Sequence, residues 1–133
     1  MFPEFPFKKD VQPTSDFDEL ERQIITACLI ELAQTDFDKT ISPGRGPHLG
    51  LTNYQVGMAI NKFGNNDKLD EKDMWAIDCA VSEISIHIDH VQAKEDPILQ
   101  VIVPRIDRLK GKILRYRGFD NKVVDSYLAA KYS

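Results

Sequence analysis

Four basic side chains recur along one face of a helix predicted near the end of the chain. An α-helix turns by about 100° per residue, so a spacing of three, four and three residues keeps side chains on one face. At about 1.5 Å of rise per residue, the row is about 15 Å long. Rows of cations suit phosphates or carboxylates as ligands. We call these residues the basic stripe: Arg105, Arg108, Lys112 and Arg115.

The basic stripe has three interpretations. It can be a solvated face, or a face neutralised by acidic residues of the first and third helices, and this interpretation is favoured. It can bind the acidic surface of another protein, which is the favoured binding function. It can also bind nucleic-acid phosphates, with an affinity that falls steeply with salt. Interleaved aromatic residues would favour single strands, but only Tyr116 is near, on the apolar side of the helix.

A weaker candidate is a polar row on the long helix predicted over residues 70–95. Glu83, His87 and His90 are spaced by four and three residues, so they share one side of this helix. Such a row binds a divalent metal when another ligand completes the site, and His48 could be that ligand. HExxH and ExxH motifs are absent, and polar residues are expected between two apolar faces. We therefore favour structural or solvated histidines and expect no cofactor.

Residues 36–50 form a predicted loop, because Pro43, Pro47 and three glycines interrupt regular structure. Arg45, within a GxG sequence, and His48 are the residues of the loop that could contact a ligand. The loop lacks the GxxxxGK[ST] pattern of a phosphate-binding loop. We interpret it as a connector, and any function is expected to be contact with a partner.

Groups suited to catalysis are scarce in this chain. A GxSxG motif is absent, and no pair of carboxylates falls in an evident pocket. Cys28 and Cys79 lie on apolar helix faces without CxxC spacing, which is typical of small buried side chains. Three histidines add little to a nucleophilic site. We therefore expect a protein without enzymatic activity.

The same two cysteines predict a reduced, cytoplasmic location. The first residues, MFPEFPFKKDVQP, carry charges where a signal peptide has its apolar core. No run of about 18 apolar residues is present, so no membrane span is expected.

Charge is unevenly distributed along the 133 residues, whose net charge is −4. Residues 1–97 contain 9 lysines and arginines against 18 acidic residues, whereas residues 98–133 contain 8 against 3. An acidic body with a basic last quarter indicates either internal complementarity or a basic surface for an anionic partner.

The fold that must position these residues is predicted to be an all-α, single-domain bundle of about five helices. The helix over residues 70–95 carries apolar residues on two opposite sides, so we expect it to be central, between layers. One stripe contains Met74, Ile77, Val81, Ile84, Ile88 and Val91, and the other contains Trp75, Cys79 and Ile86.

The remaining helices are delimited by local signals. A first helix over residues 16–35 has Ser15 as its expected N-cap, and its second half is apolar nearly all round, as in a core helix. Thr52 and Gln55 form a predicted capping box for a helix over 53–63, with Gly64 expected in the turn after it. Helices over 97–117, kinked at Pro104 and closed by Gly118, and over 121–131, capped by Asp120, complete the bundle.

Residues 1–15 are expected to be an extended arm ahead of a helical domain over residues 16–133. Phe2, Phe5 and Phe7 alternate with polar residues or proline in this arm. The arm and the second apolar stripe suggest a homodimer, with Trp75 and Ile86 at or near the interface. The alternative, which is slightly favoured, is that the other helices cover both stripes within one subunit.

These patterns predict a small intracellular interaction or regulatory protein that binds a protein partner with an acidic surface. The basic stripe, the loop over residues 36–50 and the aromatic arm would make the contacts. Nucleic-acid binding through the same stripe is the alternative, and a metal-dependent enzyme using Glu83, His87 and His90 is a distant third.

Overall fold

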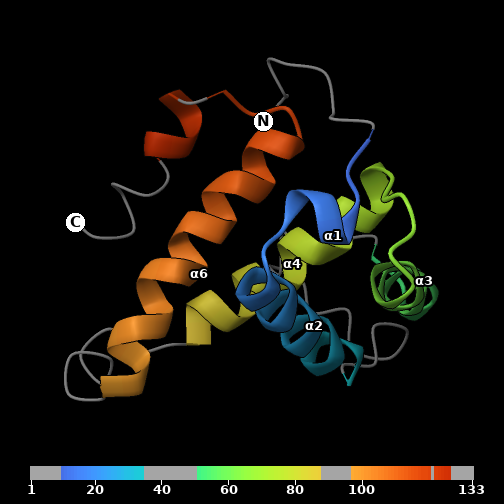
Figure 1. Cartoon of the computed structure of the whole chain (residues 1–133), viewed down its shortest axis with the longest axis horizontal. Coiled ribbons are helices and arrows are strands. Elements are labelled where there is room, and N and C mark those ends of the chain that lie inside the picture. The colour runs from blue at the N-terminus through green and yellow to red at the C-terminus, as the bar shows by residue number, and fades with distance from the viewer. Residues whose placement is uncertain (1–9, 35–50, 88–96, 121, 127–133) are drawn as a thin grey trace.

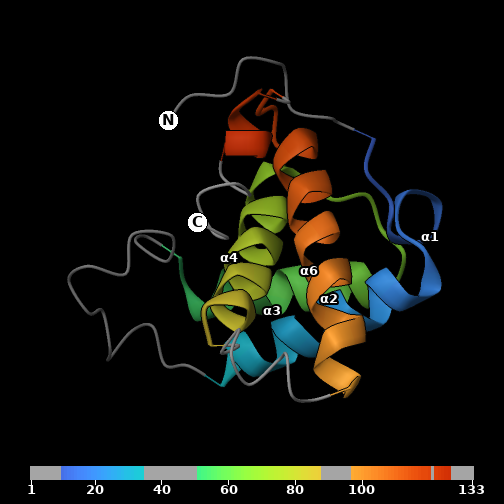
Figure 2. The ribbon, with the colours of Figure 1, turned by 90° about the vertical axis from the view of Figure 1, so that its left-hand side faces the viewer.

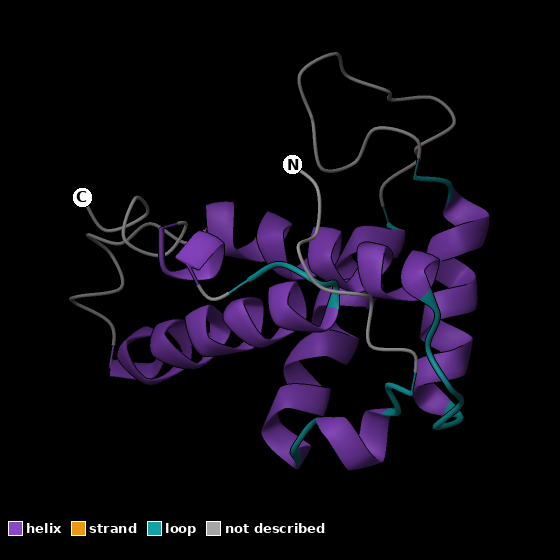
Figure 3. Ribbon diagram, turned by 90° about the horizontal axis from the view of Figure 1, so that it is seen from above, coloured by secondary structure: helices purple, strands orange, loops and turns teal. Residues whose placement is uncertain are grey.

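The computed structural model describes residues 10–34, 51–87, 97–120 and 122–126. Within these residues, every regular element is a helix, which confirms the predicted all-α bundle (Figures 1 and 3). Residues 122–126 are also helical. The labelled helices are α1 (Pro13–Asp16), α2 (Glu19–Ala33), α3 (Asn53–Gly64), α4 (Glu71–His87) and α6 (Pro97–Tyr116).

The central position predicted for the long helix is confirmed, because α4 packs against α2, α3 and α6. In Figure 2, α4 and α6 run side by side while α2 and α3 cross below them. Met74, Ile77 and Val81 of the first apolar stripe are fully buried. On the second stripe, Cys79 is buried and Trp75 is half-buried against the core. The side chains of residues 84–87, and all of 88–96, lie outside the described residues.

The start of α2 differs from the prediction. Asp18, not Ser15, is the N-cap, because Phe17 adopts an extended conformation and interrupts the helix. The Phe17 ring is buried against Phe63 and Tyr116, with centroid separations of 6.1 and 5.9 Å. Burial of this ring therefore decides where the helix begins.

The last residues assigned to the extended arm are part of the packed bundle. Val11 and Pro13 are buried, and the Leu69 amide donates a 2.9 Å hydrogen bond to the Val11 carbonyl. The short α1 follows at once, with Pro13 as its first residue. Phe2, Phe5 and Phe7 lie outside the described residues.

The second half of α2 was expected to be buried all round, and that expectation is wrong. Only one side of α2 faces the core, and its buried residues are Ile25, Cys28, Leu29 and Leu32. Ile30 is 50% exposed, and Leu20 at the start of α2 is 38% exposed. The helix lies at the surface because no described element covers its other side.

Both ends of α3 are fixed by hydrogen bonds. The predicted capping box is confirmed, with Thr52 and Gln55 each accepting a 3.2 Å bond from the backbone of the other. Gly64 was expected as the residue in the turn after the helix, but Gly64 is the last residue of α3, and the residue with positive φ is Asn66, at 58°. The Asn66 and Asp67 amides bond back into the last turn, a Schellman arrangement that asparagine can also adopt.

The structure confirms α6 as one helix that begins at Pro97 and continues through Pro104. Gly118, with a φ of 97°, ends it in a second Schellman arrangement. Its amide and that of Phe119 each donate a 3.0 Å bond to a carbonyl of the last turn. Asp120 then caps the following helical residues through a 2.8 Å bond from the Val123 amide.

Candidate functional site

The basic stripe lies on the outer side of α6. Arg105, Arg108 and Arg115 are exposed, and Lys112 is half-buried. The opposite side of the helix is core, since Ile106, Leu109 and Ile113 are buried there. The amphipathic pattern of the sequence therefore placed all four cations correctly on the helix.

Lys112 differs from the rest of the basic stripe because it is neutralised within the molecule. Its ammonium group donates a 2.9 Å hydrogen bond to Oε1 of Glu21 in the first turn of α2. The same group lies 5.2 Å from the centroid of the Phe17 ring. Pairing with the first long helix, one of the interpretations of the stripe, is therefore confirmed for this lysine, which helps to dock α6 on α2.

Arg105 and Arg108 carry the charge that remains available at this end of the stripe. Among the described residues, no acidic side chain forms an ion pair with either guanidinium. Arg108 makes one long hydrogen bond, 3.4 Å from Nε to the Pro104 carbonyl of its own helix. The five donors of each planar guanidinium are suited to bidentate contacts with a carboxylate.

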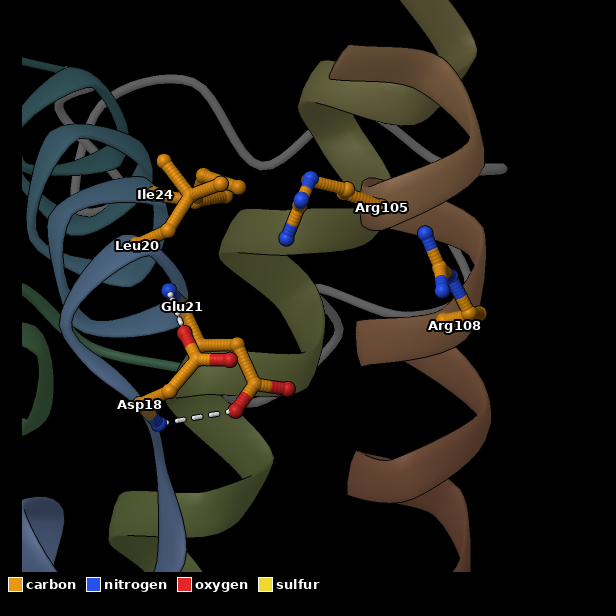
Figure 4. Close-up of a pocket in the computed structure, with 6 residues that line it drawn as sticks. All are labelled: Asp18, Leu20, Glu21, Ile24, Arg105 and Arg108. Atoms are coloured by element: carbon orange, nitrogen blue, oxygen red, sulfur yellow. Dashed lines mark hydrogen bonds between the residues drawn. The ribbon is translucent and has the colours of Figure 1, made fainter. Parts of the chain in front are cut away.

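The two arginines form one wall of a small pocket between α6 and α2, with a volume of about 110 Å³. Figure 4 shows Arg105 extending across this gap toward α2, with Arg108 one turn further along α6. The wall opposite is formed by Asp18, Leu20, Glu21 and Ile24 of the α2 start. The pocket thus joins cationic, apolar and acidic groups.

The two carboxylates of the pocket are held by the cap of α2. Oδ1 of Asp18 accepts a 2.8 Å bond from the Glu21 amide, and Oε1 of Glu21 accepts a 2.9 Å bond from the Asp18 amide (Figure 4). Glu21 also accepts the bond from Lys112. These bonds fix the carboxylates at the helix end, so they shape the pocket without closing it on Arg105 or Arg108.

A second cationic cluster contains Lys110 of α6 and Arg117 just beyond the end of that helix, and it was not predicted from the sequence. Asp78 of α4 accepts hydrogen bonds from Lys110 Nζ and from Arg117 Nη1. Ser82 donates a 3.3 Å bond to the same carboxylate and accepts one from Lys110. Lys110 is only 5% exposed and Asp78 only 6%. This cluster joins α4 to α6 in the interior.

Partial burial lowers the pKa of Arg117. Desolvation lowers the pKa of its guanidinium, against the attraction of nearby acidic groups such as Glu71. The guanidinium also lies 5.7 Å from the centroid of the Phe119 ring, just beyond the end of α6. Lys110 and Arg117, the residue that directly follows α6, are seven residues apart, a helical spacing that could have pointed to a common acidic partner.

The metal hypothesis is not tested by these residues. Glu83 is half-buried, the His87 side chain is not described, and His48 and His90 lie outside the described ranges. Within the part of the chain that the structure describes, no group of three histidine, cysteine or acidic side chains could hold a metal ion. Arg45 of the loop and the Ile86 side chain also lie outside that part.

The two thiols are poor candidates for a nucleophile. Cys28 and Cys79 are free and buried. Burial raises the pKa of Cys28 to about 11. Burial also raises the pKa of Cys79 to about 12, helped by Glu83 and opposed by Arg117. A thiol is nucleophilic as the thiolate, so neither side chain is activated at neutral pH.

Among the described helices, none combines the length and the apolar content that crossing a bilayer requires. Comparison of the chain with protein-family models, with curated proteins and with solved structures gives no match.

Proposed function

We propose that this protein is a non-enzymatic interaction or regulatory protein that binds a protein partner with an acidic surface. The observation that carries the proposal is the pair of exposed guanidiniums, Arg105 and Arg108, which line a pocket without an ion pair among the described residues. Arginine is enriched among the residues that dominate binding energy at protein interfaces. A carboxylate of the partner would complete the contacts that the two guanidiniums leave open.

The size of the pocket supports a protein partner over a small molecule. Sites for small ligands and cofactors usually enclose about 300–1,000 Å³. The pocket beside Arg105 and Arg108 has about 110 Å³, enough for one side chain. Leu20 and Ile24 give it an apolar wall, so an anchoring side chain of a larger partner fits both its volume and its chemistry.

Nucleic acid is the less favoured partner for the same surface. Phosphate binding needs a continuous row of available cations. Lys112 is already paired with Glu21, so the row of available cations is interrupted.

The experiment compares two doubly substituted proteins with the same change in charge. Arg105→Glu/Arg108→Glu reverses the candidate surface, and Lys68→Glu/Lys72→Glu reverses two exposed lysines elsewhere. Immobilised wild-type protein and the lysine variant should retain the same proteins from a lysate, and the arginine variant should lose them. Equal retention by both variants would contradict the proposal.

A parallel measurement addresses the nucleic-acid alternative. Fluorescence anisotropy of labelled duplex and single-stranded oligonucleotides is recorded at about 50 and 200 mM salt, a range in which phosphate contacts weaken markedly. Our proposal expects no binding at either salt concentration. Binding that fades with salt and disappears in Arg105→Glu/Arg108→Glu would assign the surface to nucleic acid instead.

An intracellular location and self-association belong to the same proposal. Free thiols at Cys28 and Cys79 support a reducing compartment. In a homodimer, the second subunit would cover the exposed part of the half-buried Trp75. Sedimentation equilibrium of the whole chain measures this directly, and a monomer over the accessible concentrations would remove the homodimer from the proposal.

A further inference from the structure

The exposed face of α6 extends beyond the basic stripe toward the start of the helix. Ile98 and Val101 are 69% and 62% exposed, unusually high values for large apolar side chains. They precede Arg105 by seven and four residues, so they continue the same spacing of three and four. We call this row the outer face of α6: Ile98, Val101, Arg105, Arg108, Lys112 and Arg115.

We infer that the outer face of α6 is a docking surface for one amphipathic, acidic helix of a partner protein. The inference rests on the proposed function and specifies its partner. Apolar side chains of that helix would cover Ile98 and Val101, and its carboxylates would pair with Arg105 and Arg108. The end of the face near Pro97 is therefore the apolar half of the interface, and the other end is the ionic half.

The dimensions and spacing of the outer face suit a helix. From Ile98 to Arg115 the row is about 26 Å long, at about 1.5 Å per residue. Rows spaced by three and four residues pack against the same rows of another helix, as in coiled coils and helical bundles. Figure 1 places α6 along one side of α2 and α4.

The start of α2 gives the docked helix a second wall. Leu20 is 38% exposed, and Ile24 is half-buried against the core. Both line the pocket that Arg105 and Arg108 close from the other side (Figure 4). An apolar side chain of the partner that enters this pocket would place a neighbouring carboxylate next to the guanidiniums, which couples the apolar and ionic contacts.

Charge complementarity identifies the partner as acidic. Residues 105–117 contain six cations, of which Lys110 and Arg117 pair with Asp78, and Lys112 pairs with Glu21. Arg105 and Arg108 keep no such pair among the described residues. A helix that carries carboxylates three or four residues apart can meet both guanidiniums at once.

The same charges argue against a second copy of this chain as the occupant. Two outer faces packed together, parallel or antiparallel, would bring arginines against arginines. A lipid surface is also disfavoured, because anionic headgroups attract clusters of about four to eight available cations. Lys110, Lys112 and Arg117 are already paired within the protein. Both occupants are therefore outcomes that the experiment can detect.

The test uses designed helical peptides as probes. Each matched peptide carries leucines at one end and glutamates at the other, on one face spaced by three and four residues. Two matched peptides, with the leucines at the N-terminal or the C-terminal end, cover both orientations of packing. An isomer of the same composition distributes the leucines and glutamates around the helix. Binding is measured by fluorescence anisotropy with the full chain.

We expect one matched peptide to bind at least about tenfold more tightly than the isomer, which is about 1.4 kcal/mol. Ile98→Asp/Val101→Asp and Arg105→Glu/Arg108→Glu should each weaken this binding about tenfold or more, and Lys68→Glu/Lys72→Glu should not. Because the substituted side chains are exposed, circular dichroism should show that the variants keep the fold. Absent saturable binding, or equal binding of matched peptide and isomer, overturns the inference.

The result also separates this inference from the proposed function. If capture of lysate proteins depends on Arg105 and Arg108 but not on Ile98 and Val101, the protein partner stands and the helical docking mode fails. If phosphatidylserine vesicles bind and both pairs of residues are required, the surface belongs to a membrane and the inference is overturned. Dimerisation that Ile98→Asp/Val101→Asp abolishes would assign the face to a second copy and overturn it as well.

Discussion

Lys112 of α6 and Glu21 of α2 form an ion pair, with 2.9 Å between Nζ and Oε1, at a partly exposed position. Lys110, two residues earlier on α6, points to the interior and pairs with the buried Asp78 of α4. Neighbouring lysines of one helix therefore attach it to two other helices. The surroundings of the two pairs differ, so their contributions to stability should differ too.

We expect Asp78→Ala to lower the free energy of unfolding by about 3–5 kcal/mol, because Lys110 and Arg117 would lose their common carboxylate inside the protein. Lys112→Ala removes a pair whose side chains are 32% and 19% exposed, and it should cost about 0.2–1 kcal/mol. Urea unfolding of both variants measures the difference. Similar losses would show that the buried cluster contributes no more than a surface pair.

The position of the α2 cap predicts a contrast between two nearby residues. Asp18→Ala removes the acceptor of the Glu21 amide and should cost about 0.5–2 kcal/mol. Ser15→Ala lies within α1 and outside this cap, so its effect should stay within about 0.5 kcal/mol. Thermal or urea unfolding of the two variants measures which substitution destabilises the protein more. A larger loss for Ser15→Ala would restore the cap expected from the sequence.

Two glycines are expected to respond to alanine in opposite directions. Gly57 lies inside α3, and nothing lies within 4 Å of the position that a Cβ would take. Gly57→Ala should therefore raise the free energy of unfolding by about 0.5–1 kcal/mol, since glycine weakens a helix interior. Gly118→Ala should lower the free energy of unfolding by about 1–2 kcal/mol, because the φ of Gly118 is 97°. Stabilisation of Gly118→Ala would contradict the Schellman arrangement.

We expect neither thiol to react with a disulfide reagent in the folded protein. With a pKa of about 11 for Cys28 and about 12 for Cys79, both raised by burial, few molecules carry a thiolate at pH 8. A chromogenic disulfide reagent should react with neither cysteine in native protein and with both in urea. Rapid reaction of one thiol before unfolding would show that its helix face is accessible.

Acid should weaken the junction between α3 and α4. Burial alone would raise the pKa of Asp70, but hydrogen bonds with Asp73 and the attraction of Lys62 outweigh it, so the pKa lies below its ordinary 3.8. Because the folded pKa is the lower one, the unfolded chain binds this proton first. The stabilisation is complete above the unfolded value and is lost as pH falls through the folded one.

Urea unfolding between about pH 2 and 6 should therefore show a steeper loss of stability in the wild type than in Asp70→Asn. The asparagine keeps a side-chain acceptor for the Asp73 amide, which Asp70 holds at 2.8 Å, but does not titrate. Identical slopes for the two proteins would remove Asp70 from the acid response.

The features that local sequence decides were predictable. Thr52 and Gln55 bond to each other's backbone three residues apart, so the capping box needs no tertiary contact. Gly118 likewise ends α6 because its own backbone conformation disfavours other residues. The exposure of Arg105 and Arg108 followed from the 3.6-residue period of the buried face of the same helix.

The features that the packing of distant residues decides were not predictable. The cap of α2 moved from Ser15 to Asp18 because Phe17 is buried against a ring 99 residues later in the chain, Tyr116. Asp78 and Lys110 meet only once α4 and α6 are side by side. The helical period places Ile98 and Val101 in the same row as Arg105 and Arg108, but their exposure of 69% and 62% also requires that no distant part of the chain cover that row.

Asn66 links two parts of the bundle, the end of α3 and α1. Its backbone turns the chain at the end of α3, and Oδ1 accepts a 2.9 Å hydrogen bond from the Thr14 amide of α1. Redesign by helix-end statistics would choose glycine at this position, since glycine adopts a positive φ without strain. Here glycine would adopt the turn conformation with less strain, but it would remove the hydrogen bond from the Thr14 amide of α1. The Asn66 side chain therefore connects segments that are 52 residues apart in the sequence. Residue frequencies at the ends of isolated helices do not include this contribution.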